Sequence, residues 1–489
     1  MKKRFKATIA CITLFVMLPF MMTPASAMTP LPPKSFSGRD ALGVVSTALE
    51  SEVVVENETL TFNITDFPKS NYESQEDFLS YSSTVNIKYT LYNPTNEEIT
   101  LTLAYPFGNY IEYADQVWSV DTSKYSISVN DNTVSPEIYH TYCSIYNEID
   151  YPKQFEMLTK DYITDGFLAP DTVVTKYTFK SSGVGTTLYG AVAGVALDVD
   201  PDEYPNSLFF LDRYTLPREL KNGNIRLCCY YEEENNTYDL YVIGEPLKEM
   251  PEWRFYENAF ALDADEISGR MTIVKTETMT LTEFADTKPN EALGFSQVDR
   301  YNTLISEIQS ETALRPVVQL HTFLGELDCY MRWYKYDVTI PAGERITTAV
   351  TAPAYPNIEE NYIPPVYNYN AWLTTSTTWT TSGSLDVIIN TPYYMTYSTD
   401  EYTKTDFGYS LHHDSLTTVI DENTSATMNA IHFELCSEEN PEREKGKNVG
   451  LVVFIILVAI ILLPLTIIAA AIQLIVDGVK AVIEKVKHK

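Results

Sequence analysis

The sequence has little histidine, little cysteine and few cations. Its 489 residues include six histidines and six cysteines, and 35 Lys and Arg stand against 66 Asp and Glu, which gives a formal net charge of −31. A surface this acidic repels phosphates, so a nucleic-acid-binding function is excluded. The motifs G-x-S-x-G, H-E-x-x-H and C-x-x-C are absent, which removes the common serine hydrolase, zincin and zinc-site signatures.

Long hydrophobic runs are confined to the two ends of the chain. Residues 1–27 join four cations, an apolar run and the small-residue ending Ala25-Ser26-Ala27, which is typical of a secretory signal peptide cleaved after Ala27. The alternative is an uncleaved N-terminal anchor. Val449–Ile472 holds 24 uncharged residues, of which 17 are Val, Leu, Ile or Phe, and predicts one transmembrane helix.

The flanks of this predicted span indicate its orientation. Residues 473–489 carry four lysines against Asp477 and Glu484, so the positive-inside rule places this basic tail in the cytoplasm. The sequence thus predicts a single-pass protein of the cell membrane with a large extracellular part, joined to the span by a charged spacer, residues 437–448. Because eight of the cations lie in the two ends, the extracellular part is more acidic than the whole chain.

Five cysteines follow the signal peptide: Cys143, Cys228, Cys229, Cys329 and Cys436. Five is an odd number, so at most two disulfides can form, and buried thiols are an equally good interpretation in a domain of this size. Cys228 and Cys229 lie in the predicted strand "NIRLCCYYEE", where neighbours point to opposite faces.

Alternation of apolar and polar residues dominates the middle of the chain. "SSTVNIKYTLYNPTNEEITLTLAYPFG", residues 82–108, predicts a hairpin with its turn at Asn93-Pro94-Thr95-Asn96, and "YKYDVTIPAGERITTAV", residues 334–350, predicts a second. Similar runs begin at Tyr125, Thr172, Gly223, Thr237, Gly269, Gly383 and Asn429. This spacing predicts a mainly β fold of antiparallel, Ig-like β-sandwich domains.

Two helices are expected among the strands. Residues 151–166 have moderate helical character, and residues 296–311 have an apolar stripe with Ser296 as the N-cap. The proline-rich segment 351–370 is interpreted as a loop or connector. We expect a first β-rich domain at 28–280 and a second at 281–436.

Some of these segments resemble a family of secreted bacterial domains of unknown function. They are "VNIKYTLYNPTNEEITLTLAYPF", the hairpin "YDVTIPAGERITTAV" and "WTTSGSLDVIIN", which match a V-x-V-x-Y-x-x-x-N strand, an I-P-A-G hairpin and a Trp before a Gly-led strand. The resemblance covers about a quarter of the chain. It implies an all-β extracellular fold, and it assigns no activity and no functional residue.

Three clusters are candidate sites. Asp198, Asp200, Asp202 and Glu203 resemble the start of a calcium loop, although Tyr204 and Phe209 replace the Gly and Glu of an EF-hand, and the alternative is a solvated acidic loop. Aromatic residues within 362–372 predict a recognition loop, or alternatively strand packing; they are Tyr362, Tyr367, Tyr369 and Trp372. The pair His412-His413 is interpreted as a solvated loop rather than a metal site.

These features favour a binding or interaction module that meets an envelope protein or a cell-wall polymer close to the membrane. A spacer of 12 residues spans about 40 Å at most, so the extracellular part stays near the bilayer. The alternatives are a surface hydrolase with an unrecognised site and an accessory subunit of a membrane complex. No cofactor is predicted apart from the calcium alternative.

Overall fold

The computed structural model describes most of residues 41–443. The described ranges are 41–46, 51–68, 80–109, 111–113, 116–118, 124–143, 150–185, 193–215, 217–259, 265–287, 295–310, 315–324, 329–373, 379, 382–415 and 430–443. The predicted signal peptide, the span Val449–Ile472 and the basic tail lie outside these residues. Among the residues described, no helix combines the length and the hydropathy needed to cross a bilayer.

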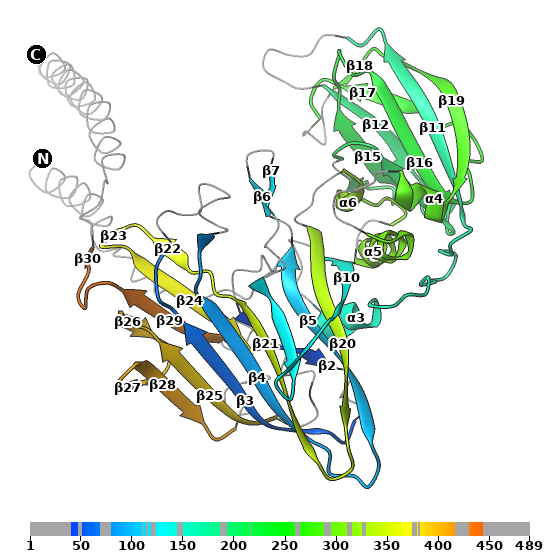
Figure 1. The fold of residues 1–489 in the computed structure, drawn as a ribbon. Coiled ribbons are helices and arrows are strands. Elements are labelled where there is room, and N and C mark those ends of the chain that lie inside the picture. The colour runs from blue at the N-terminus through cyan, green and yellow to red at the C-terminus, as the bar shows by residue number, and fades with distance from the viewer. Residues whose placement is uncertain are drawn as a thin grey trace, which may run out of the picture. The chain divides into compact units, whose positions relative to one another are not determined.

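The fold is mainly β, as the alternation predicts, and its sheets are largely antiparallel (Figure 1). Two compact units are distinguished. The first comprises Met1–Pro356, Tyr369–Pro392 and Ser398–His432, and the second comprises Asn357–Asn368, Tyr393–Tyr397 and Phe433–Lys489.

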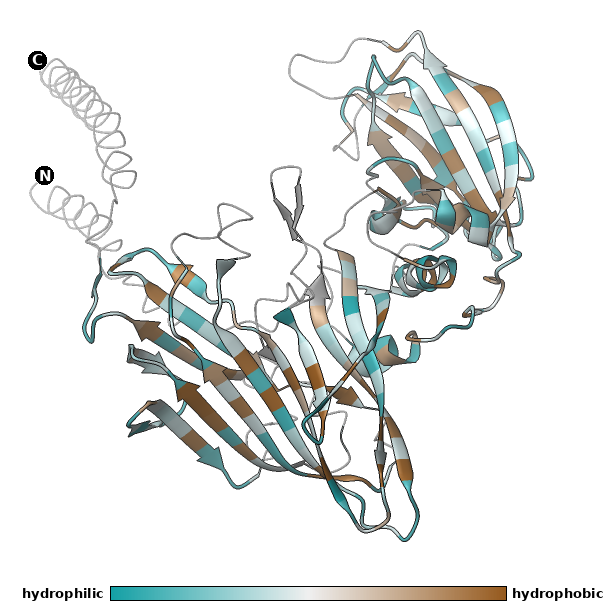
Figure 2. Cartoon of the chain, in the orientation of Figure 1, coloured by the Kyte–Doolittle hydropathy of each residue, from teal (hydrophilic) through white to brown (hydrophobic). Residues whose placement is uncertain are grey.

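The largest sheet of the first unit has eight strands in the order β27-β28-β25-β3-β4-β21-β8-β9. They are Thr403–Thr405, Gly408–His413, Ser382–Asn390, Val54–Asn63, Thr84–Tyr92, Arg345–Pro353, Ser126–Val129 and Asn132–Val134. Residues alternate between buried and half-buried along β4, and Figure 2 shows the matching alternation of hydrophobic and hydrophilic bands along the strands of this sheet.

A four-stranded sheet has the order β10-β20-β5-β2. Its strands are Glu137–Tyr142, Tyr330–Ile340, Ile99–Asn109 and Val45–Ser46. A short helix, α3, follows β10 and covers Tyr151–Glu156, which is shorter than the helix expected at 151–166. Asp150 accepts the backbone N–H of Lys153 at its start, and Pro152 occupies its first turn.

The two predicted hairpins are corrected by this topology. The strands β4 and β5 form where expected, but β4 pairs with β3 and β21, while β5 pairs with β20 and β2. The strands β20 and β21 likewise lie in different sheets. Alternation reports which face of a strand is buried but not which sheet the strand joins, so two strands in facing sheets have the pattern of a hairpin.

Each connection is therefore an arch that carries the chain from one sheet to the other. The two arches lie side by side: the Asn93 amide donates to the Glu344 carbonyl at 3.1 Å, and the Gly343 amide donates to the Thr95 carbonyl at 3.1 Å. Gly343 has a φ of +68°, a conformation that favours glycine.

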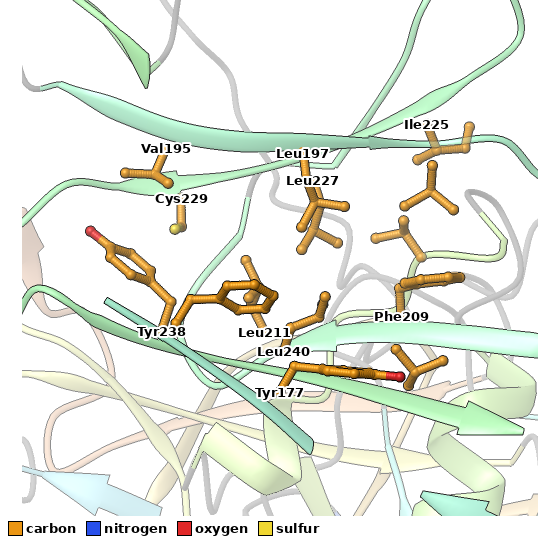
Figure 3. Packing of buried hydrophobic residues seen from close by; sticks show 14 of the residues in the cluster. Tyr177, Val195, Leu197, Phe209, Leu211, Ile225, Leu227, Cys229, Tyr238 and Leu240 are labelled. Carbon is orange, nitrogen blue, oxygen red and sulfur yellow. The ribbon is translucent and has the colours of Figure 1, made fainter. Parts of the chain in front are cut away.

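Between β10 and β20 the chain builds a separate layered region. One sheet has the order β13-β16-β11-β19, with strands Ser207–Leu211, Thr237–Gly244, Val173–Ser182 and Arg270–Thr280. The other has the order β14-β15-β12-β17-β18, with strands Arg218–Glu219, Ile225–Tyr230, Gly194–Val199, Trp253–Tyr256 and Glu266–Ile267. Side chains such as Leu197, Leu227 and Leu240 from both sheets point toward one another and form one core (Figure 3).

Helices cover the opposite face of the β13-β16-β11-β19 sheet. They are α4 at Leu281–Asp286, α5 at Gln297–Ser310 and α6 at His321–Leu324, and their apolar side chains form a second core with that sheet. The helix expected at 296–311 is confirmed, and the Ser296 hydroxyl accepts the Asp299 amide at 3.1 Å as a cap. The domain boundary predicted near residue 280 falls between this sheet and the helices that cover it.

The second unit contains short strands where the sequence suggested a connector. β22 at Asn357–Glu359 pairs with the start of β24 at Val366–Trp372, and β23 at Tyr362–Ile363 pairs with β30 at Glu442–Arg443. Segment 351–370 is thus largely extended strand, and the predicted spacer contains the short strand β30. Its prolines stand at strand ends and between strands, where no ladder hydrogen bond is lost.

A five-stranded sheet has the order β1-β24-β29-β26, with β22 added on β24. Here β1 is Ala41–Leu42, β29 is Ala430–Cys436 and β26 is Tyr394–Ser398, and β24 and β29 each run along the chain from one unit into the other. A last pair joins β6 at Ile111–Tyr113 to β7 at Gln116–Trp118.

Candidate functional site

A polar groove lies on the outer face of the β14-β15-β12-β17-β18 sheet. Its volume is about 450 Å³. It is lined by Asp198, Leu220, Lys221, Asn222, Asn224, Arg226, Glu252 and Arg254. The lining therefore offers carboxylate acceptors together with guanidinium, ammonium and amide donors.

The alternation of three strands creates this groove. In each strand one residue enters the core, so the residue next to it points outward. The inward and outward residues are Leu197 and Asp198 in β12, Leu227 and Arg226 in β15, and Phe255 and Arg254 in β17. The register then sets Asp198 directly opposite Arg226. One outward polar residue from each strand is enough to build the floor.

Asp198 and Arg226 form a two-point ion pair. The Arg226 Nε donates to Asp198 Oδ1 at 2.7 Å and its Nη2 donates to Oδ2 at 2.9 Å, with the two side chains 15% and 20% exposed. This planar geometry is the strong form of an Arg–carboxylate contact. The hydrogen bonds that Arg226 donates to Asp198 raise the pKa of the Arg226 guanidinium, so its charge is fixed.

Arg254 extends the network toward the rim of the groove. Its Nη2 donates to Glu252 at 3.2 Å, and its Nη1 lies 3.8 Å from the Asp198 carboxylate. Its side chain is 38% exposed, so it keeps contact with solvent. Asp198 thus lies between two guanidinium groups.

The wall of the groove is a turn between β14 and β15. The Leu220 amide donates to the Asn224 carbonyl at 2.8 Å, and the Asn222 side chain accepts the Asn224 amide at 3.2 Å. Gly223 has a φ of +88° and supplies the left-handed step. This turn brings Lys221 and two amide side chains to the groove.

Aromatic and apolar residues adjoin the polar groove on the same sheet face. The Arg226 guanidinium lies 4.7 Å from the centre of the Tyr256 ring. Ala196, Cys228 and Ala259 form a small buried cluster against which Tyr230 and Tyr256 pack. The face therefore combines planar polar groups with tyrosine rings.

The four acidic residues of the predicted calcium loop are separated by their roles. Asp198 is held in the ion pair with Arg226, whereas Asp200 accepts the backbone amide of Asp202 at 2.9 Å in the turn after β12. The Glu203 carbonyl accepts the Lys248 ammonium at 2.6 Å. Within the described ranges, no group of three His, Cys, Asp or Glu side chains could hold a metal ion.

The predicted aromatic recognition residues differ in exposure. Tyr369 and Trp372 are 1% and 3% exposed, and the Tyr369 hydroxyl shares a 2.8 Å hydrogen bond with the Tyr81 hydroxyl. Tyr362 and Tyr367 are half-buried. Of these four residues, a ligand could therefore reach only Tyr362 and Tyr367 without rearrangement of the core.

His412 and His413 end β28, and each faces carboxylates. His412 contacts Asp386 at 2.7 Å and Asp414 at 3.2 Å, and these hydrogen bonds raise the pKa of the His412 imidazole. His413 lies 3.4 Å from Asp400. The two rings are therefore engaged with different aspartates.

Arg226, Arg254 and Asn222 were not among the residues predicted from the sequence. The signal that could have found them is a single arginine in the middle of each apolar strand, in "NIRLCC" and "EWRFYE". Such residues must face outward from a two-sheet core, and on β15 and β17, the two strands that flank β12, they make a charged strip.

No family model and no curated protein matches this sequence. A solved structure from Legionella pneumophila, described as a candidate nutrient-binding protein, is similar at 10% identity and a TM-score of 0.28. The match covers 81% of this chain and 70% of that chain. At this TM-score the likeness carries no argument about function.

Proposed function

We propose that this chain is a membrane-anchored binding module whose Ig-like β-sandwich region binds a hydroxyl-rich polymer of the cell envelope in the Asp198–Arg226–Arg254 groove. The observation that carries the proposal is the pairing of acceptors and planar donors beside Tyr256 in one groove. Sugar hydroxyls both donate and accept hydrogen bonds, and the apolar face of a sugar ring packs on tyrosine.

The location rests on the ends of the sequence. A signal peptide at residues 1–27 and a span at Val449–Ile472 would hold the folded region outside the cell and close to the bilayer. The acidic surface keeps that region soluble and repels anionic polymers. The groove combines three cations, Lys221, Arg226 and Arg254, with two carboxylates, so its net charge is small and it offers both donors and acceptors to the hydroxyls of a neutral glycan.

The direct test is sedimentation of the detergent-solubilised full chain with insoluble cell-wall material, followed by competition with soluble neutral oligosaccharides. We expect saturable binding that Arg254→Ala weakens by about 10- to 150-fold, because loss of one charge-assisted hydrogen bond costs about 1.5–3 kcal/mol. Arg270→Ala is the matched control, since it removes an exposed arginine from β19 on the other sheet. Equal binding by the Arg254→Ala variant and the unaltered chain would overturn the proposal.

A further inference from the structure

Two cysteines meet where the chain enters and leaves the inserted sandwich. Strands β10 and β20 pair antiparallel, and their register ends with Tyr142 opposite Tyr330. One step further, the Cys143 amide donates to the Cys329 carbonyl at 2.7 Å. The two cysteines therefore lie next to each other just beyond the last pair of this ladder, and no disulfide joins them in the structure.

Both side chains are buried beside the end of this strand pair. Cys143 packs in one core cluster with Met331 and Trp333 of β20, and Cys329 immediately precedes that strand. Both cysteines are 1% exposed.

The backbone separation of the two cysteines suits a disulfide. Opposite residues joined by a backbone hydrogen bond have Cα atoms about 5.5 Å apart. Disulfide-linked residues have Cα separations of about 4.4–6.8 Å. To form the bond, the two Cβ atoms, about 4.5–5.5 Å apart in such pairs, must approach to about 3.5–4.5 Å.

The remaining cysteines lack this arrangement. Cys228 lies opposite Ala196 and Cys229 lies opposite Val195. As neighbours on one strand, Cys228 and Cys229 enter two different clusters on opposite faces of the sheet. The Cys436 sulfur contacts the Pro365 carbonyl at 3.4 Å.

We propose that Cys143 and Cys329 form a disulfide that closes the base of the inserted region. In the forming reaction, one thiolate attacks the disulfide of a thiol-oxidising partner and displaces one of its sulfurs as a thiolate. The second cysteine thiolate then attacks the mixed disulfide. The chain loses two protons and two electrons, and the oxidant leaves as a dithiol. Because both side chains are buried in the folded protein, the exchange precedes the closing of β10 on β20.

The bond would link the paired strands β10 and β20, called the stem here, between which residues 144–328 are inserted. It would lie outside the cores of the inserted region. It is independent of the groove and of the polymer-binding proposal. A disulfide acts mainly by restricting the unfolded chain, and the effect grows with the length of the closed loop. We therefore expect the bridged chain to keep its stem paired under conditions that separate the reduced stem.

The test uses the full chain, isolated from membranes of exporting cells by lysis directly into denaturant with N-ethylmaleimide and no reductant. Proteolysis and mass spectrometry should give one linked peptide pair containing Cys143 and Cys329, with maleimide on Cys228, Cys229 and Cys436. Maleimide on both Cys143 and Cys329, or a link from either to a different cysteine, would overturn the assignment.

A second arm does not depend on export. Detergent-solubilised full chain is reduced, unfolded and refolded with an excess of oxidised glutathione, which serves as the disulfide-bearing oxidant. The unaltered chain and Cys436→Ser should migrate faster on a non-reducing gel than after reduction, whereas Cys143→Ala, Cys329→Ala and the double variant should not. If circular dichroism shows that both the unaltered chain and the double variant refold, equal mobility of the two would rule out the bridge.

Discussion

The side-chain amide of Asn93 donates a hydrogen bond of 3.0 Å to the carbonyl oxygen of Ile340. The same amide also reaches the carbonyls of Glu97 at 2.7 Å and Pro341 at 3.2 Å, and its oxygen accepts the Thr95 amide at 3.0 Å. Asn93 is fully buried. One side chain thus joins the arch between β4 and β5 to the arch between β20 and β21.

This contact predicts a large effect of Asn93→Ala. The substitution leaves buried carbonyls without their donor, and unpaired buried groups cost about 1–3 kcal/mol each. We expect the free energy of unfolding to fall by about 2–4 kcal/mol in urea titrations of the solubilised full chain.

Asn96→Ala is the control for that experiment, because Asn96 lies in the same connection and is exposed. Its effect should stay within about 0.5 kcal/mol. Equal destabilisation by the two variants would show that the arches do not depend on the buried amide.

A second prediction concerns the Tyr89 hydroxyl in the core of the same region. It donates to the Glu58 carboxylate at 2.9 Å and accepts the Val44 amide at 3.1 Å. Trp379 stacks on the Tyr89 ring and donates its indole N–H to the Val44 carbonyl at 3.2 Å. The residue pair Tyr89 and Trp379 therefore holds the segment of residues 43–46 against the sheet.

Tyr89→Phe keeps the ring and removes both hydrogen bonds of the hydroxyl. We expect a loss of about 1–3 kcal/mol in the free energy of unfolding, and faster amide hydrogen exchange at Val44. Tyr92→Phe is the matched control, since Tyr92 lies on the half-buried outer face of the same strand. Unchanged exchange at Val44 in Tyr89→Phe would contradict this role.

How far the sequence predicted the fold can be judged from these strands. The runs at 84–92 and 99–109 were correctly predicted as strands, because apolar and polar residues alternate along each run and this alternation is a local pattern. Their partners were not, because pairing in facing sheets depends on arch geometry and on contacts such as Asn93 with Ile340, which no local pattern encodes. The helix at α5 was predicted well because its apolar stripe and its cap are both local.

The candidate groove was not predicted, and of its lining only Asp198 was named, as part of a calcium loop. Asp198 was singled out as an acidic residue in a cluster, whereas its partner Arg226 comes from another strand and is joined by register alone. The acidic residues that follow it in sequence go into a turn. Long-range register, rather than composition, therefore decides which charges share the groove.

A third prediction follows from His140, which is 4% exposed between β10 and α5. Its imidazole and backbone amide bond the Asp299 carboxylate, and the Phe295 ring packs on it at 3.7 Å. Burial is the largest influence and lowers the pKa of His140 in the folded state, although Asp299 opposes this shift. The unfolded chain, whose histidines titrate near pH 6.5, then binds more protons than the folded chain below that pH.

The stability contributed by His140 is therefore present above about pH 6.5 and is lost as the pH falls below it. We expect the urea midpoint of the unaltered chain to decrease from pH 7.5 to pH 5.5, and His140→Gln to reduce that slope. His412→Gln gives a contrast of opposite sign, since the pKa of the exposed His412 is raised. A steeper decrease in His140→Gln would show that the paired, charged imidazole is the stable form.

The last prediction separates the structural role of Arg226 from the binding role of Arg254. Arg226 is 15% exposed and pairs at two points with Asp198, so Arg226→Ala leaves a largely buried carboxylate with a weaker partner. The cost should lie between that of a surface pair and a buried one, about 1–2 kcal/mol in the free energy of unfolding. Asp198→Asn in the Arg226→Ala background should recover part of this loss because it removes the unpaired carboxylate charge.

Arg254 is 38% exposed at the rim, so Arg254→Ala should change stability by less than about 0.5 kcal/mol while weakening polymer binding. If the double variant were less stable than Arg226→Ala alone, the carboxylate would be stabilised by groups other than Arg226, and the groove floor would not depend on this ion pair.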